Sequence, residues 1–398
     1  MKLLEAYSRS CSVDIKSQNK CYLYPKYFPL CLDKYITIQN KSGMPAKDYT
    51  LTQEVVDILY PFLDKHNITM VLLGTPDAPP LSKVLDLRGQ TSINQAAYIL
   101  NHSLCHFSMD SWSCHYCGEN DIPLVALYGS TSIKNHGPAR YNKDKTILIE
   151  SHRNGNLPSF QREENPKMID LINSEDVAKS IVKLLNLEMD YPFETKHVGL
   201  SYHNKMVESA CDSVINPQQL GIPSLIMKLD YNFNLAVLIN QLQICKCTIV
   251  TEKPVPIEIL KQFKGNIIEV IYKIKMDHDP SFVKGLFESK IPYRLFSEME
   301  EKDLNPIKLD YIDYGIITKR NINKPEKLNN CDLKNLYYKS SKLTLGRGKI
   351  YQSKADYFNE REIGNIQVYP QEVQEKNLNL LWEEEEYLIF LEKTSTKT

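Results

Sequence analysis

The sequence predicts an α/β protein with two sheet-containing domains, and two observations lead to this prediction. Short β-branched apolar runs alternate with helical patterns along residues 30–190, which is typical of parallel strands joined by helices. The same alternation returns from residue 224 onward, and 398 residues are enough for two medium-sized cores. We therefore expect one α/β domain in residues 1–195 and a second in residues 196–398.

In the first half, five apolar runs predict strands, and helical patterns lie between them. The strands are expected at Tyr35–Gln39, Met70–Leu73, Leu104–Ser108, Leu124–Leu127 and Thr146–Glu150. Helices are expected at Leu51–His66 and Ser174–Leu187, the first with apolar residues on one face. Thr50 and Ser92 each precede a glutamine by three residues, the spacing of a capping box.

In the second half, residues 196–221 are predicted to be a linker, because Asn216-Pro217 and Gly221 interrupt the pattern. Strands are expected at Ser224–Leu229, Lys246–Thr251, Ile267–Tyr272, Tyr293–Phe296 and Tyr314–Thr318. Helices are expected at Asn234–Leu242, Pro256–Phe263 and Pro280–Ser289. The end of the chain, Leu380–Leu391, predicts a helix with its glutamates facing water.

The composition is that of a soluble protein and excludes few functions. Hydrophobic residues make up 42% and charged residues 24%, with a formal net charge of -1. No apolar run approaches the roughly 20 residues that a membrane span needs, and no signal peptide is apparent at the start. We expect a cytoplasmic protein without a membrane span.

No metal site is expected. The ten cysteines include only one C-x-x-C pair, Cys114 and Cys117, whereas a structural zinc site needs four ligands. Reduced, buried thiols are the alternative that we favour. Asp277-His-Asp279 has the spacing of a metal-diphosphate motif, but Asp279 precedes Pro280 and predicts a helix N-cap instead.

Polar residues gather where two successive strands are predicted to end. The segment Asp110–His115 (DSWSCH) follows one strand, and Gly129-Ser-Thr131 follows the next. Ligands of open α/β sheets bind beyond the carboxyl ends of the strands. A third loop, Asn40–Tyr49, precedes a helix and supplies a lysine, Lys47, so these segments together predict a site for a phosphorylated ligand.

These segments resemble a known family. In order and spacing, Asp86–Ile93 (DLRGQTSI), Asp110–His115, Pro123–Thr131 (PLVALYGST) and Gly137-Pro138 resemble the ADP-heptose:lipopolysaccharide heptosyltransferases of glycosyltransferase family 9. The resemblance covers about the first 140 residues. It implies a GT-B-like fold, with two Rossmann-like domains facing across a cleft, and transfer of a sugar with inversion. It also implies a nucleoside-diphosphate sugar as donor substrate, and no metal or cofactor.

The resemblance also implies roles for particular residues. Asp110 would bind sugar or ribose hydroxyls, and Lys47 would be the family's phosphate-contacting lysine. The other residues expected on the donor side are Ser42, Gly43, Ser111, Ser113, His115, Gly129, Ser130 and Thr131. One position departs from the family, because its glycine in the D-[ST]-G-x-x-H turn is Trp112 here. Trp112 could stack on the ligand or could block the pocket.

The order of the two domains also departs from the family, in which the nucleotide-binding domain comes second. The chain therefore resembles a circular permutation of the family, or else the second domain is unrelated. The family's acceptor domain opens with a strand and a loop that carries a catalytic aspartate. The nearest equivalent here is Asp230, at the end of the predicted strand Ser224–Leu229, so the resemblance implies that Asp230 is the base that deprotonates the acceptor hydroxyl. The alternative is that Asp230 caps the following helix.

A basic segment, residues 319–354, suggests a further partner. Its ten lysines and arginines stand against two acidic residues, giving a net charge of +8, with three tyrosines interleaved. Such a segment suits a polyanionic acceptor such as a nucleic acid, although a solvated lysine-rich connection has the same composition.

The acceptor itself stays open, since a saccharide or another hydroxyl compound fits equally well. Two other functions compete with a sugar transferase. One is a catalytically inactive binding or scaffold protein, and the other is a glycosyltransferase that acts on nucleic acid.

Overall fold

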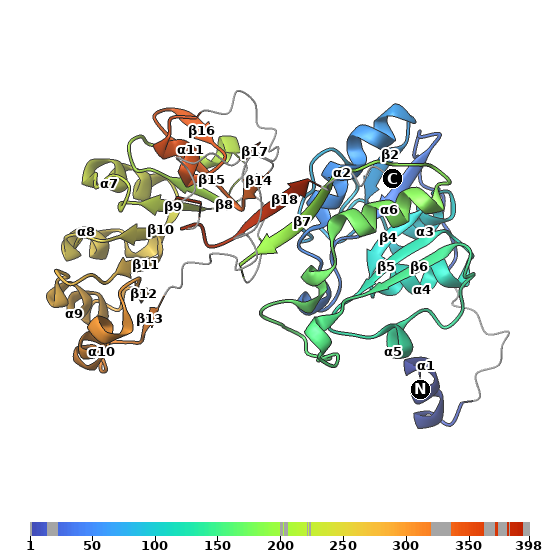
Figure 1. The fold of residues 1–398 in the computed structure, drawn as a ribbon, viewed down its shortest axis with the longest axis horizontal. Helices are drawn as coiled ribbons and strands as arrows, with labels where there is room; N and C mark the ends of the chain where they lie inside the picture. The colour runs from blue at the N-terminus through green and yellow to red at the C-terminus, as the bar shows by residue number, and fades with distance from the viewer. Residues whose placement is uncertain are drawn as a thin grey trace. The chain divides into compact units, whose positions relative to one another are not determined.

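The computed structural model describes residues 2–13, 23–199, 202, 206–220, 222, 224–319, 336–361, 371–372, 380–381 and 383–392. The chain forms two compact units: unit 1 contains residues 1–202 and 389–398, and unit 2 contains residues 203–388. Each unit is built on a mostly parallel sheet with helices packed on it (Figure 1), so the predicted α/β class is confirmed. The division falls after Tyr202 and not at residue 195, and the end of the chain returns to unit 1.

The central sheet of unit 1 has six strands in the order β3-β2-β1-β4-β5-β6, and all five pairs are parallel. The strands are β1 (Tyr35–Ile38), β2 (Thr69–Leu72), β3 (Leu85–Asp86), β4 (His106–Met109), β5 (Leu124–Tyr128) and β6 (Thr146–Glu150). The chain moves outward from β1 to β3 and then returns to β4 beside β1. This reversal of strand order is a topological switch point, where ligands of such sheets bind.

Helices and short 3-10 turns connect and cover the strands of unit 1. They are α1 (Leu3–Ser10), η1 (Pro45–Lys47), α2 (Thr52–Lys65), α3 (Ile93–Asn101), α4 (Trp112–Glu119), α5 (Ile133–His136), η2 (Arg153–Gly155), η3 (Met168–Leu171) and α6 (Ser174–Leu184). β7 (Phe193–Val198) and β18 (Tyr387–Glu392) are neighbours in a separate small sheet. The capping box of Ser92 forms as predicted, but α2 begins after Leu51 without a side-chain cap, so the box predicted at Thr50 is wrong.

The core of unit 1 lies on both faces of its sheet. Every residue of β1, β4 and β5 is buried, as expected for central strands of a parallel sheet covered on both sides. The apolar face of α2, with Val55 and Leu59 among its buried residues, packs against α6. These strands and helices therefore fix the loops that follow β1 and β4 on a rigid framework.

The sheet of unit 2 has eight strands in the order β13-β12-β11-β10-β9-β8-β15-β16. They are β8 (Met206–Ser209), β9 (Ser224–Lys228), β10 (Lys246–Thr251), β11 (Ile267–Lys273), β12 (Tyr293–Ser297), β13 (Ile317–Lys319), β15 (Lys342–Gly346) and β16 (Lys349–Tyr351). All neighbouring pairs from β13 to β15 are parallel, and β15 and β16 form a hairpin. β14 (Leu336–Ser340) pairs antiparallel with β17 (Gln371–Glu372).

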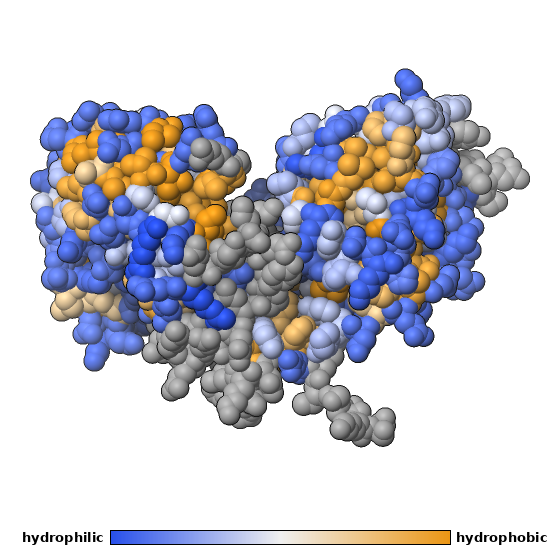
Figure 2. All heavy atoms as spheres, turned by 90° about the horizontal axis from the view of Figure 1, so that it is seen from above, coloured by the Kyte–Doolittle hydropathy of each residue, from blue (hydrophilic) through white to orange (hydrophobic). Residues whose placement is uncertain are grey.

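The helices and 3-10 turns of unit 2 are η4 (Pro217–Leu220), α7 (Leu235–Ile244), α8 (Ile257–Gln262), η5 (Lys264–Asn266), α9 (Pro280–Glu288), α10 (Glu301–Asp310) and α11 (Lys354–Phe358). Apolar side chains reach the surface of both units among polar ones (Figure 2). Because apolar atoms form about half of an ordinary protein surface, this exposure alone does not identify an interface.

Several predictions for the second half are wrong. Residues 196–221 are not a linker, since β7 extends to Val198 and β8 lies inside the eight-stranded sheet. The predicted C-terminal helix is wrong over Tyr387–Glu392, which form strand β18. The apolar run in this segment is rich in strand-forming residues, and the glutamates precede the strand. The strand predicted at Tyr314–Thr318 begins only at Ile317.

One buried carboxyl of unit 1 predicts a pH-dependent stability. Asp170 lies in η3 and accepts a hydrogen bond from the Thr50 N–H at 3.0 Å. Burial raises its pKa to about 6, although the contact with Thr50 opposes the shift. The folded state therefore binds this proton more tightly than the unfolded state does, and the resulting stability is lost as pH rises through 6.

We expect the unfolding free energy of the wild type to fall by up to about 3 kcal/mol between pH 4 and pH 7 through this group. Asp170→Asn should lack that part of the fall, and urea denaturation at the two pH values checks it. Asp64→Asn, at an exposed position of α2, is the control. Equal pH dependence in Asp170→Asn and the wild type would contradict the prediction.

Candidate functional site

The loops that follow β1 and β4 bring a lysine and an aspartate together at the switch point. Lys47 is the last residue of η1, and Asp110 follows β4 directly. Lys47 Nζ lies 2.7 Å from Asp110 Oδ2, and the two side chains are only 14% and 5% exposed. From the sequence, Asp110 was predicted to bind ribose or sugar hydroxyls and Lys47 to bind phosphate. The structure places these two side chains in direct contact.

Asp110 also receives contacts from two other segments. Thr131 Oγ1, beyond β5, donates a hydrogen bond to Oδ2 at 2.9 Å. His115 Nε2, in α4, lies 3.6 Å from Oδ1. Burial favours the neutral acid, but the contacts with His115 and Lys47 outweigh it and hold the pKa of Asp110 at about 2. Asp110 is therefore an ionised carboxylate at the centre of the cluster.

The start of α4 leaves hydrogen-bond donors available. Its N-cap, Ser111, makes no side-chain cap, and its Oγ instead lies 3.0 Å from Ser113 Oγ. Uncapped N–H groups at a helix start, with the positive end of the helix dipole, favour an anion. Trp112, the first residue of α4, is 36% exposed, so its indole does not fill the core.

Gly129, Ser130 and Thr131 line the end of β5, and all are held by packing. A Cβ on Gly129 would lie 2.4 Å from Ile169 Cβ, so glycine is required here for steric reasons. Ser130 and Thr131 are buried. Arg153 was not predicted from the sequence: its guanidinium donates to the Gly129 and Thr131 carbonyls, each at 2.6 Å. Arg153 thus fixes this segment beside Asp110.

The residues predicted in the loop after β1 are only partly available to a ligand. The Ser42 N–H donates to Asp48 Oδ1 at 2.6 Å, and its hydroxyl donates to the Met44 carbonyl at 2.8 Å. A Cβ on Gly43 would meet nothing within 4 Å, so a glycine is not required there. Lys47 is the side chain of this loop that reaches Asp110.

His136 is a second residue near the cluster that no sequence motif indicates. It ends α5, and its ring lies 5.5 Å from that of Phe160 at an angle of 31°. Burial lowers its pKa, while the charge of Asp110 opposes the shift. His136 therefore belongs to the electrostatic environment of Asp110.

The predicted base, Asp230, lies in unit 2. Its Oδ2 is 3.0 Å from Lys228 Nζ, and both side chains are 13% exposed. Its Oδ1 is buried without a hydrogen-bond partner within the described part of the chain. The alternative role as a helix cap is wrong, because Asn234 caps α7 by accepting from the Val237 N–H at 3.2 Å.

The basic segment 319–354 is described only at its two ends, since residues 320–335 lie outside the described residues. Three of its described cations have carboxylate partners: Lys342 pairs with Glu385 at 2.8 Å, Arg347 with Glu360 at 2.9 Å, and Lys354 with Glu383. Lys339 is buried. In the described part, half of the six cations therefore have a carboxylate partner.

Within the described ranges, no group of three or more His, Cys, Asp or Glu side chains could hold a metal ion. Cys114 and Cys117 are free and buried, and Asp279 caps α9 by accepting from the Ser281 N–H at 2.9 Å. Across those same ranges, the helices are all too short or too polar to cross a membrane.

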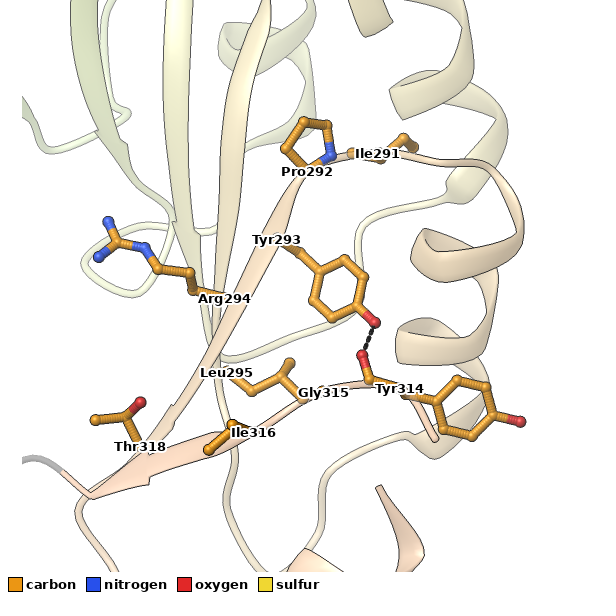
Figure 3. A pocket seen from close by; sticks show the side chains of 9 residues that line it. All are labelled: Ile291, Pro292, Tyr293, Arg294, Leu295, Tyr314, Gly315, Ile316 and Thr318. Carbon is orange, nitrogen blue, oxygen red and sulfur yellow. Dashed lines mark hydrogen bonds between the residues drawn. The ribbon is translucent and has the colours of Figure 1, made fainter. Parts of the chain in front are cut away.

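A separate hollow of about 330 Å³ lies in unit 2 beside β12 and β13 (Figure 3). Tyr293 points into it, with its hydroxyl donating to the Tyr314 carbonyl, and Arg294 points to the other side of β12. Arg294 pairs with Glu269. None of the residues predicted to bind the nucleotide sugar lines this hollow.

The contact of Lys47 with Asp110 predicts a coupling in stability. Lys47→Met should lower the free energy of unfolding by about 1–3 kcal/mol, because it leaves a buried carboxylate without its cation. Asp110→Asn in addition should cost less than the sum of the single changes. The Asp110 contribution should persist above pH 4 and be lost toward pH 2, since its folded pKa is depressed.

A urea-denaturation double-mutant cycle at pH 7 measures this coupling. Lys41→Met is the matched control, because its partner Asp77 is 70% exposed and such pairs contribute about 0–1 kcal/mol. Additive effects of Lys47→Met and Asp110→Asn would contradict the prediction.

No protein-family model and no curated protein sequence matches the chain. Solved structures do match. They include a glycosyltransferase family 9 protein from Veillonella parvula (21% identity, TM-score 0.32, covering 39% of this chain and 46% of that one). They also include Escherichia coli ADP-heptose lipopolysaccharide heptosyltransferase II (18% identity, TM-score 0.31, covering 46% of this chain and 50% of that one). A third is the iron-containing dodecameric glycosyltransferase TibC from enterotoxigenic E. coli (13% identity, TM-score 0.34, covering 44% of this chain and 52% of that one). The matches thus span about half the length of those chains, and these proteins are of the kind that the sequence motifs resemble.

Proposed function

We propose that the chain binds a nucleoside-diphosphate sugar in unit 1 and transfers the sugar to a hydroxyl acceptor. One observation carries the proposal: Lys47 and Asp110 meet at the switch point of an all-parallel sheet with the strand order 3-2-1-4-5-6. Sheets with this order bind nucleotides where the strand order reverses. The sequence resemblance to a nucleotide-sugar transferase family supports the same site.

In this proposal, Asp110 and Lys47 bind different parts of the nucleotide sugar. Asp110, an ionised acceptor of hydrogen bonds, takes ribose or sugar hydroxyls, and Lys47 turns from Asp110 to the diphosphate. Ser111, Ser113 and the first-turn N–H groups of α4 hold the diphosphate from the other side. Hydrogen-bond donors placed in this way stabilise the negative charge that develops on the leaving diphosphate during transfer.

The other predicted residues complete the reaction in this proposal. His115 would contact the diphosphate, and Thr131, with Ser130 and Gly129, would close the pocket. Asp230 would act as base toward the acceptor, without a metal and with inversion at the sugar carbon. For this role, Lys228 would have to release its carboxylate.

The competing functions make different predictions. An inactive binding protein is favoured by the Lys47–Asp110 contact, in which the two charges neutralise each other, and by Trp112 in place of glycine. A nucleic-acid acceptor is less favoured, because three of the six described cations of segment 319–354 have carboxylate partners. Steeply salt-dependent binding of DNA or RNA would restore that candidate.

A thermal-shift and calorimetry screen against ADP, UDP, GDP, CDP and dTDP and their sugars tests the donor site. ADP and ADP-heptose come first, because solved structures similar to this chain include E. coli heptosyltransferase WaaC with ADP and TibC in complex with ADP-D-β-D-heptose. We expect one nucleotide class to raise the melting temperature of the wild type, since it binds only the folded state. Asp110→Ala should abolish the shift, and the exposed-site variant Asp64→Asn should keep it. Binding that survives Asp110→Ala would place the pocket elsewhere.

Asp230→Asn tests the second half of the proposal. We expect it to leave donor affinity unchanged and to lower the turnover number at least 100-fold, in line with general-base catalysis, which contributes about 10²–10⁴-fold. Lys228→Met is the companion variant, because it removes the partner of Asp230 but keeps the carboxylate. Full turnover in Asp230→Asn would eliminate this residue as the base.

A further inference from the structure

A chain of side-chain hydrogen bonds runs from the interior of the unit 1 sheet to the proposed diphosphate site. Thr37 Oγ1, in β1, lies 2.9 Å from Nδ1 of His106, in β4. Nε2 of the same ring lies 2.9 Å from Ser113 Oγ, which is 3.0 Å from Ser111 Oγ. Thr37 and His106 are fully buried, Ser113 is 1% exposed, and Ser111 is only half-buried. The chain therefore ends at the half-buried N-cap of α4.

The imidazole in this chain is neutral. Burial lowers the pKa of His106 to about 3 and outweighs a contact with the Thr37 backbone, which acts in the other direction. A neutral imidazole carries its proton on one nitrogen and accepts a hydrogen bond at the other. The position of that single proton decides the direction in which every hydroxyl of the chain donates.

The distances around Thr37 favour one direction. Apart from His106 Nδ1 at 2.9 Å, the acceptors available to its hydroxyl proton are Ser103 Oγ at 3.4 Å and the Cys105 carbonyl at 3.5 Å. Because a hydroxyl donates best at about 2.7–2.8 Å, its proton goes to Nδ1. Nε2 then carries the ring proton and donates to Ser113.

Ser113 consequently donates onward to Ser111. Ser111 already accepts this hydrogen bond and makes no cap to the helix. Its own proton is then left to point at whatever occupies the start of α4. A hydroxyl held as a donor suits a charged acceptor, since hydrogen bonds to ionised groups are the stronger ones.

We propose that Thr37 and His106 are positioning residues that orient the Ser111 hydroxyl as a hydrogen-bond donor to the anionic group of the bound ligand. The proposal rests on the proposed donor site and deepens it. Thr37 and His106 lie in strands, outside every segment predicted from the motifs, and neither touches the ligand. They act through Ser113 and Ser111, and they make the site selective for a phosphorylated ligand.

The first test is a double-mutant cycle read by calorimetric titration with ADP, UDP and GDP. Thr37→Val, which has the same shape without the hydroxyl, should weaken binding of the responding diphosphate about tenfold, the size of one hydrogen bond to a charged group. Thr37→Ser should restore the affinity. In an Ser111→Ala background, Thr37→Val should have no further effect, because the orientation it controls is gone.

Ser108→Ala is the matched control, because it removes another fully buried hydroxyl from the neighbouring strand β4, one without a hydrogen-bond partner in the described residues. It should bind the diphosphate as the wild type does. An equal loss from Thr37→Val with and without Ser111 would overturn the proposal, since it would assign Thr37 a purely structural role.

The second test determines the tautomer of His106 by long-range ¹H–¹⁵N correlation spectroscopy of the free protein. We expect the proton on Nε2, and a proton on Nδ1 would overturn the proposal. This readout needs no ligand. If the wild type binds none of the diphosphates, the proposed function fails, and the tautomer still decides whether the chain has the inferred direction.

Discussion

The site in unit 1 depends on the cost of burying an ionised carboxylate. Asp110 is 5% exposed, and a buried charge is tolerated only with partners of the opposite sign and with hydrogen bonds. Lys47, His115 and Thr131 supply these from three separate segments, and each segment must keep its place for the carboxylate to stay charged. The segment after β5 must also keep its place, because it carries Thr131. Arg153 fixes this segment by donating hydrogen bonds to the Gly129 and Thr131 carbonyls.

Most of unit 1 could be predicted from the sequence, because its strands are short apolar runs separated by helical patterns. Asp110 and Lys47 could be predicted as neighbours, since both follow strands that end at the same edge of the sheet. The partners that hold the site could not. Arg153 lies in an irregular turn far along the chain, and His106 reads as an ordinary strand residue until β1 places Thr37 beside it.

Unit 2 was harder to predict, for reasons that particular residues make plain. β8 contains Glu208, a charge that argues against a central strand. The structure accommodates it, because Tyr231 and Thr344 donate hydrogen bonds to it at 2.8 and 2.9 Å. α10 contains Pro306, which hides a helix from a propensity argument. The contacts of Glu208 with Tyr231 and Thr344 join residues that are far apart in the sequence, so no local sequence pattern indicates them.

The return of the chain to unit 1 has a consequence for biosynthesis. Unit 2 is an insertion in unit 1, because residues 389–398 belong to the first unit while 203–388 form the second. A ribosome delivers all of unit 2 before it delivers the residues of β18 that lie beside β7. While unit 2 is being synthesised, unit 1 is therefore incomplete, and the edge of β7 that pairs with β18 has no partner. An unpaired strand edge is a template for wrong partners, so folding of unit 2 soon after its emergence would shorten the period at risk.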